Sequence, residues 1–257
     1  MRILLYNIDH GGKDGNNLFG RWPKLIQIFK DLRPDMAVIL EAWNWRATFE
    51  LKSFAKKTNF KYYFLSPSNT KHHLGLLTNI QPKKIIKYKN NFHHSVLRAD
   101  FKNFTIFGIH LNSKNETKRI IEAKKIIGLT KKTKSPIVLG DFNSLSPQDD
   151  YNDKELFIEL KRKKIDKFGK EKLEKKVIKK FITAGLIDAF KAFHPEKKIY
   201  YSVPTKNCRD INHLTKLRLD YAFVDQTIID QVNKIKIIKN QTTDWASDHY
   251  PLILELS

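Results

Sequence analysis

The chain has 257 residues, a formal net charge of +21 and 41% hydrophobic residues. This length allows one large domain or two small ones, and the apolar content is typical of a folded globular protein. Because Cys208 is the only cysteine, the sequence excludes an intramolecular disulfide and a zinc site built from several cysteines. We expect one domain over residues 1–257 and a cytoplasmic location.

The positive charge favours a polyanionic partner, and nucleic acid is the first candidate. However, only nine of the 48 basic residues are arginine, and the chain is also rich in Ile and Asn. A genome biased toward A and T produces this composition without selection for binding, so the charge supports a nucleic-acid partner without proving one. We expect no membrane span, because no apolar run reaches the necessary length. The N-terminal apolar run is too short for a secretion signal, and no obligate protein partner is evident.

The first half of the chain alternates strands and helices. A strand is predicted over residues 2–8, then a loop rich in Gly and Asn, then a helix within residues 18–34 that ends at a proline. The apolar run over residues 36–43 predicts a strand covered on both faces. Further strands are predicted over residues 61–66, 74–80, 94–101 and 104–111, followed by a helix over 116–132 and a strand over 135–143.

A highly charged helical region with a break near Gly169 is predicted over residues 154–183. Residues 151–182 hold 12 basic and 6 acidic side chains around a sparse apolar stripe. A solvated amphipathic helix is the favoured interpretation, and a helix that touches a phosphate backbone is the alternative. Later strands are predicted over residues 199–203, 218–224, 235–239 and 251–257, so many strands with few helices predict packed sheets with helices outside.

Polar side chains recur where the predicted strands end or begin. They are Asn7, Glu41, His110, Asp141, Asn143, Asp220, Asp248 and His249. Each one alone is typical of a solvated turn, but the ends of adjacent strands converge in space. Because several carboxylates buried together without a cation are costly, the pattern predicts a bound metal ion. Oxygen ligands without cysteine favour Mg²⁺ or Mn²⁺ over zinc.

The ordered motifs YN, LE, HL, GDFN, RLDY and SDH resemble those of the endonuclease/exonuclease/phosphatase family, which includes DNase I-like and exonuclease III-like enzymes. The match runs from Asn7 to His249. The resemblance implies an α/β fold, namely a four-layer α/β sandwich in which two mixed β-sheets pack face to face with helices outside. It also implies a divalent-metal-dependent hydrolase of phosphodiester bonds, with Mg²⁺ or Mn²⁺ as cofactor and nucleic acid, above all DNA, as substrate.

The resemblance also implies a metal-binding set. Glu41, helped by Asn7, would hold the catalytic ion against a phosphate oxygen, and Asp248 would assist near the metal or brace the loop of the adjacent histidine.

Five further residues receive catalytic roles from the resemblance. Asp141 would orient and help to deprotonate the attacking water, and Asn143 would hydrogen-bond the phosphate or position that carboxylate. His249 would contact the phosphate, kept cationic by Asp220, and His110 would be a second histidine facing the phosphate.

Two alternatives to a nuclease stay open. One is a phosphatase or phospholipase-type phosphodiesterase acting on a small or lipid headgroup phosphoester, and the other is a non-catalytic nucleic-acid-binding module. Abasic endonucleases usually carry aromatic residues just before the RLDY motif, whereas this chain has Lys216 and Leu217 there. Five histidines outside the motifs are expected at the surface or in loops, although His72 and His73 could line a substrate groove. They are His10, His72, His73, His93 and His94.

Overall fold

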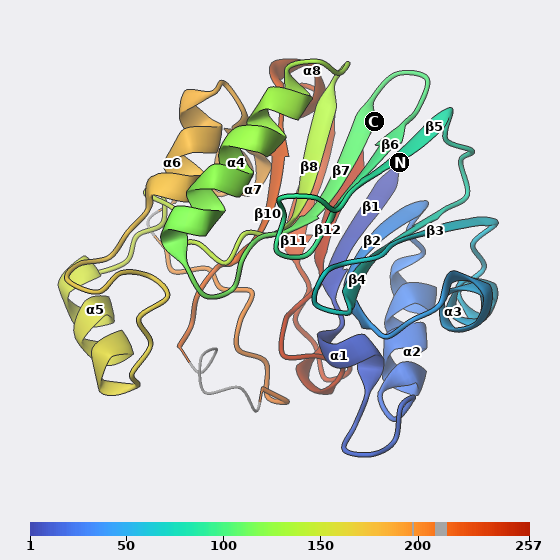
Figure 1. Ribbon diagram of the computed structural model, residues 1–257, viewed down its shortest axis with the longest axis horizontal. Helices are drawn as coiled ribbons and strands as arrows, with labels where there is room; N and C mark the ends of the chain where they lie inside the picture. The colour runs from blue at the N-terminus through green and yellow to red at the C-terminus, as the bar shows by residue number, and fades with distance from the viewer. Residues whose placement is uncertain (197, 209–214) are drawn as a thin grey trace.

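The structure, a computed structural model, describes residues 1–196, 198–208 and 215–257 (Figure 1). Its described residues form two mixed sheets of six strands each. The first sheet has the order β11 (Val232–Ile237), β12 (Leu252–Leu256), β1 (Arg2–Asn7), β2 (Met36–Trp43), β4 (His72–Thr78) and β3 (Tyr62–Ser66). The second has the order β5 (Lys84–Tyr88), β6 (Val96–Asp100), β7 (Thr105–His110), β8 (Pro136–Asp141), β10 (Asp220–Val224) and β9 (Ile187–Asp188).

Helices cover the outer faces of both sheets. Helices α2 (Trp22–Leu32) and α3 (Lys52–Lys57) pack on the first sheet, and α4 (Glu116–Thr130) and α6 (Lys176–Thr183) pack on the second (Figure 1). The other helical segments of the described residues are α1 (Asp9–Gly12), η1 (Ala47–Leu51), α5 (Asp153–Arg162), α7 (Ala189–Phe193), α8 (Gln226–Ile229) and η3 (Thr243–Trp245). The predicted four-layer α/β sandwich is therefore confirmed. No helix in the described ranges is long and apolar enough to cross a membrane.

Alternation along the strands builds the core. In β1, Ile3 and Leu5 face the second sheet, whereas Leu4 and Tyr6 face the helices on the outer side. All four side chains are at most 1% exposed. Burial of each aliphatic side chain stabilises the folded state by about 1.5–3 kcal/mol. Strands buried on both faces therefore form a stable support for the residues at their ends.

The topology brings the polar strand ends to one edge. Strands β1 and β2 are parallel, as are β7 and β8, so their carboxyl ends point the same way. In register, Asp141 of β8 lies opposite His110 of β7 on one side and opposite Asp220, the first residue of the antiparallel β10, on the other. The convergence expected from the sequence therefore follows directly from strand direction.

Two local features differ from the predictions, and a third, the break near Gly169, is confirmed. Residues 199–203 form no strand; only Val203 makes a bridge, to Leu217, because this segment joins neither sheet. Strand β5 was not predicted, because its lysines give an exposed edge strand little apolar character. The charged region contains two helices, α5 and α6, separated by a long irregular connection that includes Gly169 at a φ of 127°.

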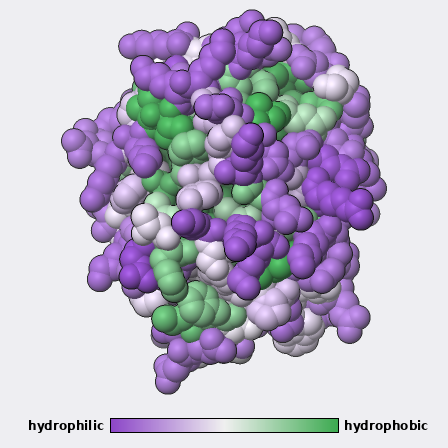
Figure 2. Space-filling view, turned by 90° about the vertical axis from the view of Figure 1, so that its right-hand side faces the viewer, coloured by the Kyte–Doolittle hydropathy of each residue, from purple (hydrophilic) through white to green (hydrophobic). Residues whose placement is uncertain are grey.

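The outer surface agrees with the high content of charged residues. Hydrophilic side chains dominate the side that carries β3 and α3, and apolar surface there is broken into separate patches (Figure 2).

Candidate active site

The strand ends open into a cavity of about 630 Å³. The side chains that line it are His10, Glu41, Thr70, His72, His93, His94, His110, Ser113, Lys114, Asp141, Asn143 and Lys167. Four of the residues singled out in the sequence therefore line one cavity. Behind it lie Asp220 and His249, which are at most 1% exposed.

Asp141 is the last residue of β8, and Asn143 lies two residues beyond the strand with a φ of 47°, yet both line the same cavity, as predicted. The backbone N–H of Asn143 donates to Oδ1 of Asp141 at 2.7 Å, and its side-chain amide donates to Oδ2 at 3.2 Å. Phe142 points the other way and packs on Phe181 and Tyr221. Burial raises the pKa of Asp141, although its carboxylate is 3.9 Å from Nε2 of His249. The result is a fixed carboxylate with enhanced basicity.

His249 and Asp220 form a buried pair. Nδ1 of His249 lies 2.7 Å from Oδ2 of Asp220, and both residues are buried. Burial lowers the pKa of the imidazole, but the carboxylates of Asp220 and Asp248 more than offset it and leave that pKa well above its usual value. The imidazole of His249 therefore carries a positive charge beside Asp141.

Glu41 is aimed into the cavity by an irregularity in β2. The pairing of β2 with β4 shifts between Ile39 and Ala42, and Glu41 has a φ of 58°, in the left-handed region. The side-chain amide of Asn7 donates to Oε1 of Glu41 at 3.1 Å, while its oxygen accepts from the backbone N–H of Asp9. Asn7 thereby orients the Glu41 carboxylate.

The surroundings of Glu41 fit a bound cation. Burial and the nearby carboxylates of Asp248 and Asp9 raise the pKa of Glu41 to about 7. Asp248 lines a second cavity that shares His10 with the first. Since three carboxylates repel one another there, a divalent metal ion is the natural compensation. Glu41, Asn7 and Asp248 could hold it.

His110 is stacked on another histidine. Its ring lies 4.0 Å from that of His94, with an angle of 11° between the planes. Burial lowers the pKa of His94 to about 3 and holds that of His110 well below its usual value, so both are neutral at pH 7. Nε2 of His110 is 3.4 Å from Oδ2 of Asp141, which places this ring at the floor of the cavity.

Of the five histidines expected at the surface or in loops, His10 is exposed and His93 and His94 lie in the loop between β5 and β6, as expected. His94 is 4% exposed, and His10, His72 and His93 line the cavity together with it. His73, on the opposite face of β4, instead accepts a hydrogen bond from the backbone N–H of Ser68. The available signal was the adjacent pair His72 and His73, directly before the strand predicted over residues 74–80. Neighbouring residues of a strand point to opposite faces, so one of the two must face the site.

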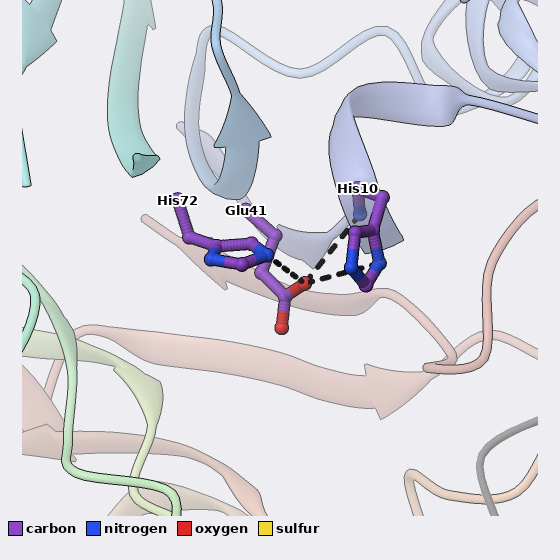
Figure 3. Close-up of side chains that lie close together, drawn as sticks. All are labelled: His10, Glu41 and His72. Atoms are coloured by element: carbon purple, nitrogen blue, oxygen red, sulfur yellow. Dashed lines mark hydrogen bonds and ion pairs between the residues drawn. The ribbon is translucent and has the colours of Figure 1, made fainter. Parts of the chain in front are cut away.

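Two of these histidines converge on Glu41 (Figure 3). His72 comes from the start of β4 and His10 from α1, and both rings point toward the Glu41 carboxylate. Nε2 of His72 is 3.8 Å from Oε2 of Glu41, and Nδ1 of His10 is 4.0 Å from the same oxygen. A hydrogen bond to Asp9 raises the pKa of His10.

Lys167 is a further site residue that the sequence did not single out. It belongs to the irregular connection between α5 and α6, and its Nζ donates to Oδ1 of Asn143 at 3.3 Å. A cation at the cavity wall adds to the charge on His249. The charged region thus contributes to the site through its loop, not through a helix face.

The similarity to known proteins agrees with this geometry. The model of the endonuclease/exonuclease/phosphatase family matches residues 4–249. The chain belongs to this family. Its fold is shared with a 3′ phosphatase from Neisseria bound to a product DNA hairpin (TM-score 0.75, 16% identity) and an AP endonuclease from Archaeoglobus fulgidus (TM-score 0.77, 15% identity). In each case the similarity covers 100% of this chain and 99% of the other. No curated protein matches the chain.

Proposed function

We propose that this family member is a divalent-metal-dependent phosphodiesterase, and specifically a nuclease that acts on DNA. The observation that carries the proposal is the buried Asp141 carboxylate, fixed by Asn143 and flanked by the charged His249 and by His110. This set supplies a base, one positive imidazole directly behind the cavity and one neutral imidazole in its wall, and phosphodiester hydrolysis needs a base and such donors.

Glu41, with Asn7 and Asp248, holds the metal ion, for which Mg²⁺ and Mn²⁺ are the proposed candidates. When bound, the ion supplies positive charge to the phosphate oxygens. Side chains of the protein carry out the proton transfer and bind the phosphate. Asp141 accepts a proton from the attacking water, because its raised pKa makes it a stronger base than a surface carboxylate. His249 donates a hydrogen bond from Nε2 to the phosphate, and Asp220 holds its opposite nitrogen.

DNA is the proposed substrate for two reasons. The net charge of +21 favours a polyanion, and of two proteins that share the fold, one is described as bound to a product DNA hairpin and the other as an AP endonuclease. Abasic specificity is not part of the proposal, because Leu217 is fully buried in the apolar cluster under α5 and does not line the cavity. A cytoplasmic location stays a prediction from the single cysteine.

The test is a substrate panel with supercoiled plasmid, a duplex oligonucleotide, a 3′-phosphorylated oligonucleotide and a lipid headgroup phosphodiester, each with Mg²⁺, Mn²⁺ or EDTA. We expect metal-dependent cleavage of the DNA substrates. Turnover of a non-nucleic phosphoester without cleavage of any nucleic acid would overturn the nuclease proposal.

Asp141→Asn is the matched control variant. It keeps the size of the side chain and the hydrogen bond from the Asn143 N–H but removes the base. We expect hydrolysis to fall by roughly 100-fold or more, while the folded state and DNA binding are retained. Undiminished hydrolysis by the folded variant removes Asp141 from its assigned role.

A further inference from the structure

The metal site proposed above contains more than oxygen ligands. His10, Glu41 and His72 each offer one ligand atom, and these atoms all lie within 4.8 Å of one another (Figure 3). Two ligand atoms on one metal ion lie roughly 3 to 4 Å apart, given metal–ligand bonds of about 2.1 Å. Small side-chain rotations are therefore enough to bring the three atoms onto one ion.

The ring of His72 is oriented as in a metal ligand. Its Nδ1 lies 3.2 Å from the backbone oxygen of Thr70, so Nδ1 carries the proton and donates. Nε2 then keeps its lone pair, and Nε2 is the atom that faces Glu41 at 3.8 Å. A histidine that binds metal through one nitrogen commonly donates its other N–H to a carbonyl or carboxylate.

His10 differs in that one nitrogen makes both contacts: its Nδ1 bonds Asp9 and also lies 4.0 Å from Oε2 of Glu41. To bind the ion, the ring must therefore turn so that Nε2 faces Glu41, while Nδ1 keeps the bond to Asp9. Nδ1 of His10 lies 2.6 Å from Oδ1 of Asp9, and the backbone N–H of His10 donates to Oε2 of Glu41 at 3.4 Å. Arg21 in turn holds the Asp9 carboxylate at 2.9 Å. The backbone of α1 is left-handed at His10, with a φ of 47°, which turns this short segment back onto the end of β2. The backbone of His10 and the Asp9 carboxylate are thus fixed by several independent contacts.

We propose that His10 and His72 join Glu41 as ligands of one metal ion, so that the site prefers first-row transition ions such as Mn²⁺, Co²⁺ or Zn²⁺ over Mg²⁺. The affinity of a site with nitrogen ligands rises from Mn²⁺ to Co²⁺, so the preference should be smallest for Mn²⁺ and larger for Co²⁺ and Zn²⁺, whereas Mg²⁺ is bound by oxygen. This inference rests on the proposed function only for the role of Glu41 and refines the identity of its ion. A phosphate ligand is disfavoured here because its negative charge would face Glu41, Asp9 and Asp248.

The test measures metal binding without any substrate. Calorimetric titration and the absorption spectrum of the Co²⁺ protein are compared for wild type, His10→Gln, His72→Gln and the double variant. We expect a nitrogen-ligated Co²⁺ spectrum in the wild type. Loss of a residue that only holds a ligand in place reduces metal affinity by roughly 10- to 100-fold. These variants remove a ligand itself, so their affinity for Co²⁺ and Mn²⁺ should fall by at least as much. Affinity for Mg²⁺ should change little, so the preference for transition ions collapses.

His73→Gln is the matched control, because it changes a histidine on the opposite face of the same strand and leaves an acceptor for Ser68. It should keep the wild-type Co²⁺ spectrum, and thermal melting without metal checks that all variants fold. Unchanged Co²⁺ affinity and spectrum in the double variant overturn the proposal. That outcome is distinct from failure of the nuclease proposal, in which Co²⁺ binds through the imidazoles but no ion supports cleavage of nucleic acid.

Discussion

Asp220 acts on the candidate site only through His249. Its Oδ2 lies 2.7 Å from the imidazole, and it is the main cause that raises the pKa of His249. We expect Asp220→Asn to lower that pKa, observable by NMR titration of the ring, and to reduce kcat by about 100-fold, the cost of losing one donor to a developing charge. KM should change less, because Asp220 does not face the cavity.

The exposed Asp230→Asn is the control for that substitution, since its carboxylate is bonded only to Gln226 on the surface. An unchanged titration of His249 in a folded Asp220→Asn protein would falsify the positioning role.

Backbone strain is also present at this site. Non-glycine residues with positive φ include Asp9, His10, Glu41 and Asn143, with φ values between 47° and 58°. Such conformations cost of order 1–3 kcal/mol each and persist only where the surroundings enforce them. Seven other non-glycine residues in the described ranges also have a positive φ, so this conformation is not confined to the site, but at these four positions it aims side chains or backbone groups toward it.

At the scale of elements, the connection between α5 and α6 is fixed to the site by Arg119 of α4. This buried guanidinium donates to the backbone oxygen of Lys167, to that of Asn112 at 2.9 Å, and to the Glu116 carboxylate at 2.8 Å. Since Arg119 holds the backbone, the Lys167 ammonium is presented to the cavity beside Asn143.

We expect Lys167→Met to weaken DNA binding and to reduce the salt slope of the binding constant by about one, the signature of one lost phosphate contact. Anisotropy titrations with a labelled duplex at several salt concentrations measure both quantities. Lys170→Met, an exposed position of the same connection, removes the same charge. Equal effects of the two variants would show that Lys167 contributes only general charge.

The close pairing of β7 with β8 depends on Gly140. A Cβ at this position would lie 2.1 Å from the backbone oxygen of Ile109, so the strands would have to separate. Because His110 and Asp141 are the last residues of these strands, Gly140→Ala should displace both and abolish hydrolysis. We expect a loss of several kcal/mol in unfolding free energy, on the order of an overpacked core.

Gly128, in the last turn of α4, is the opposite case, since nothing lies within 4 Å of a Cβ built there. Gly128→Ala should stabilise the protein by about 0.5–1 kcal/mol through helix propensity, with activity unchanged. Urea denaturation of both variants checks the pair, and a Gly140→Ala protein as stable and active as wild type contradicts the steric argument.

For the whole molecule, the sequence was sufficient to predict the layers and the convergence of the motif residues. Apolar alternation identifies the central strands, and GDFN follows such a strand directly, so Asp141 could be placed at its end. The register shift that turns Glu41 inward depends on long-range pairing with β4, which no local pattern encodes. For the same reason the sequence could not reveal that His72 and His10 meet at Glu41.

The net charge of +21 leaves one question that belongs to the whole molecule, namely whether the lysines bind DNA or only reflect composition. If they form a binding surface, the logarithm of the affinity of Asp141→Asn for a duplex should fall linearly with the logarithm of salt concentration. The slope should be steeper than about −3, because each neutralised phosphate contributes about −0.9. The inactive variant allows measurement in Mg²⁺ without loss of substrate.

A slope near −1 would mean that phosphate is bound only inside the cavity and that the remaining positive charge is not part of the DNA-binding surface. In that case the substrate would be selected by the site alone, and short oligonucleotides should bind as tightly as long duplexes.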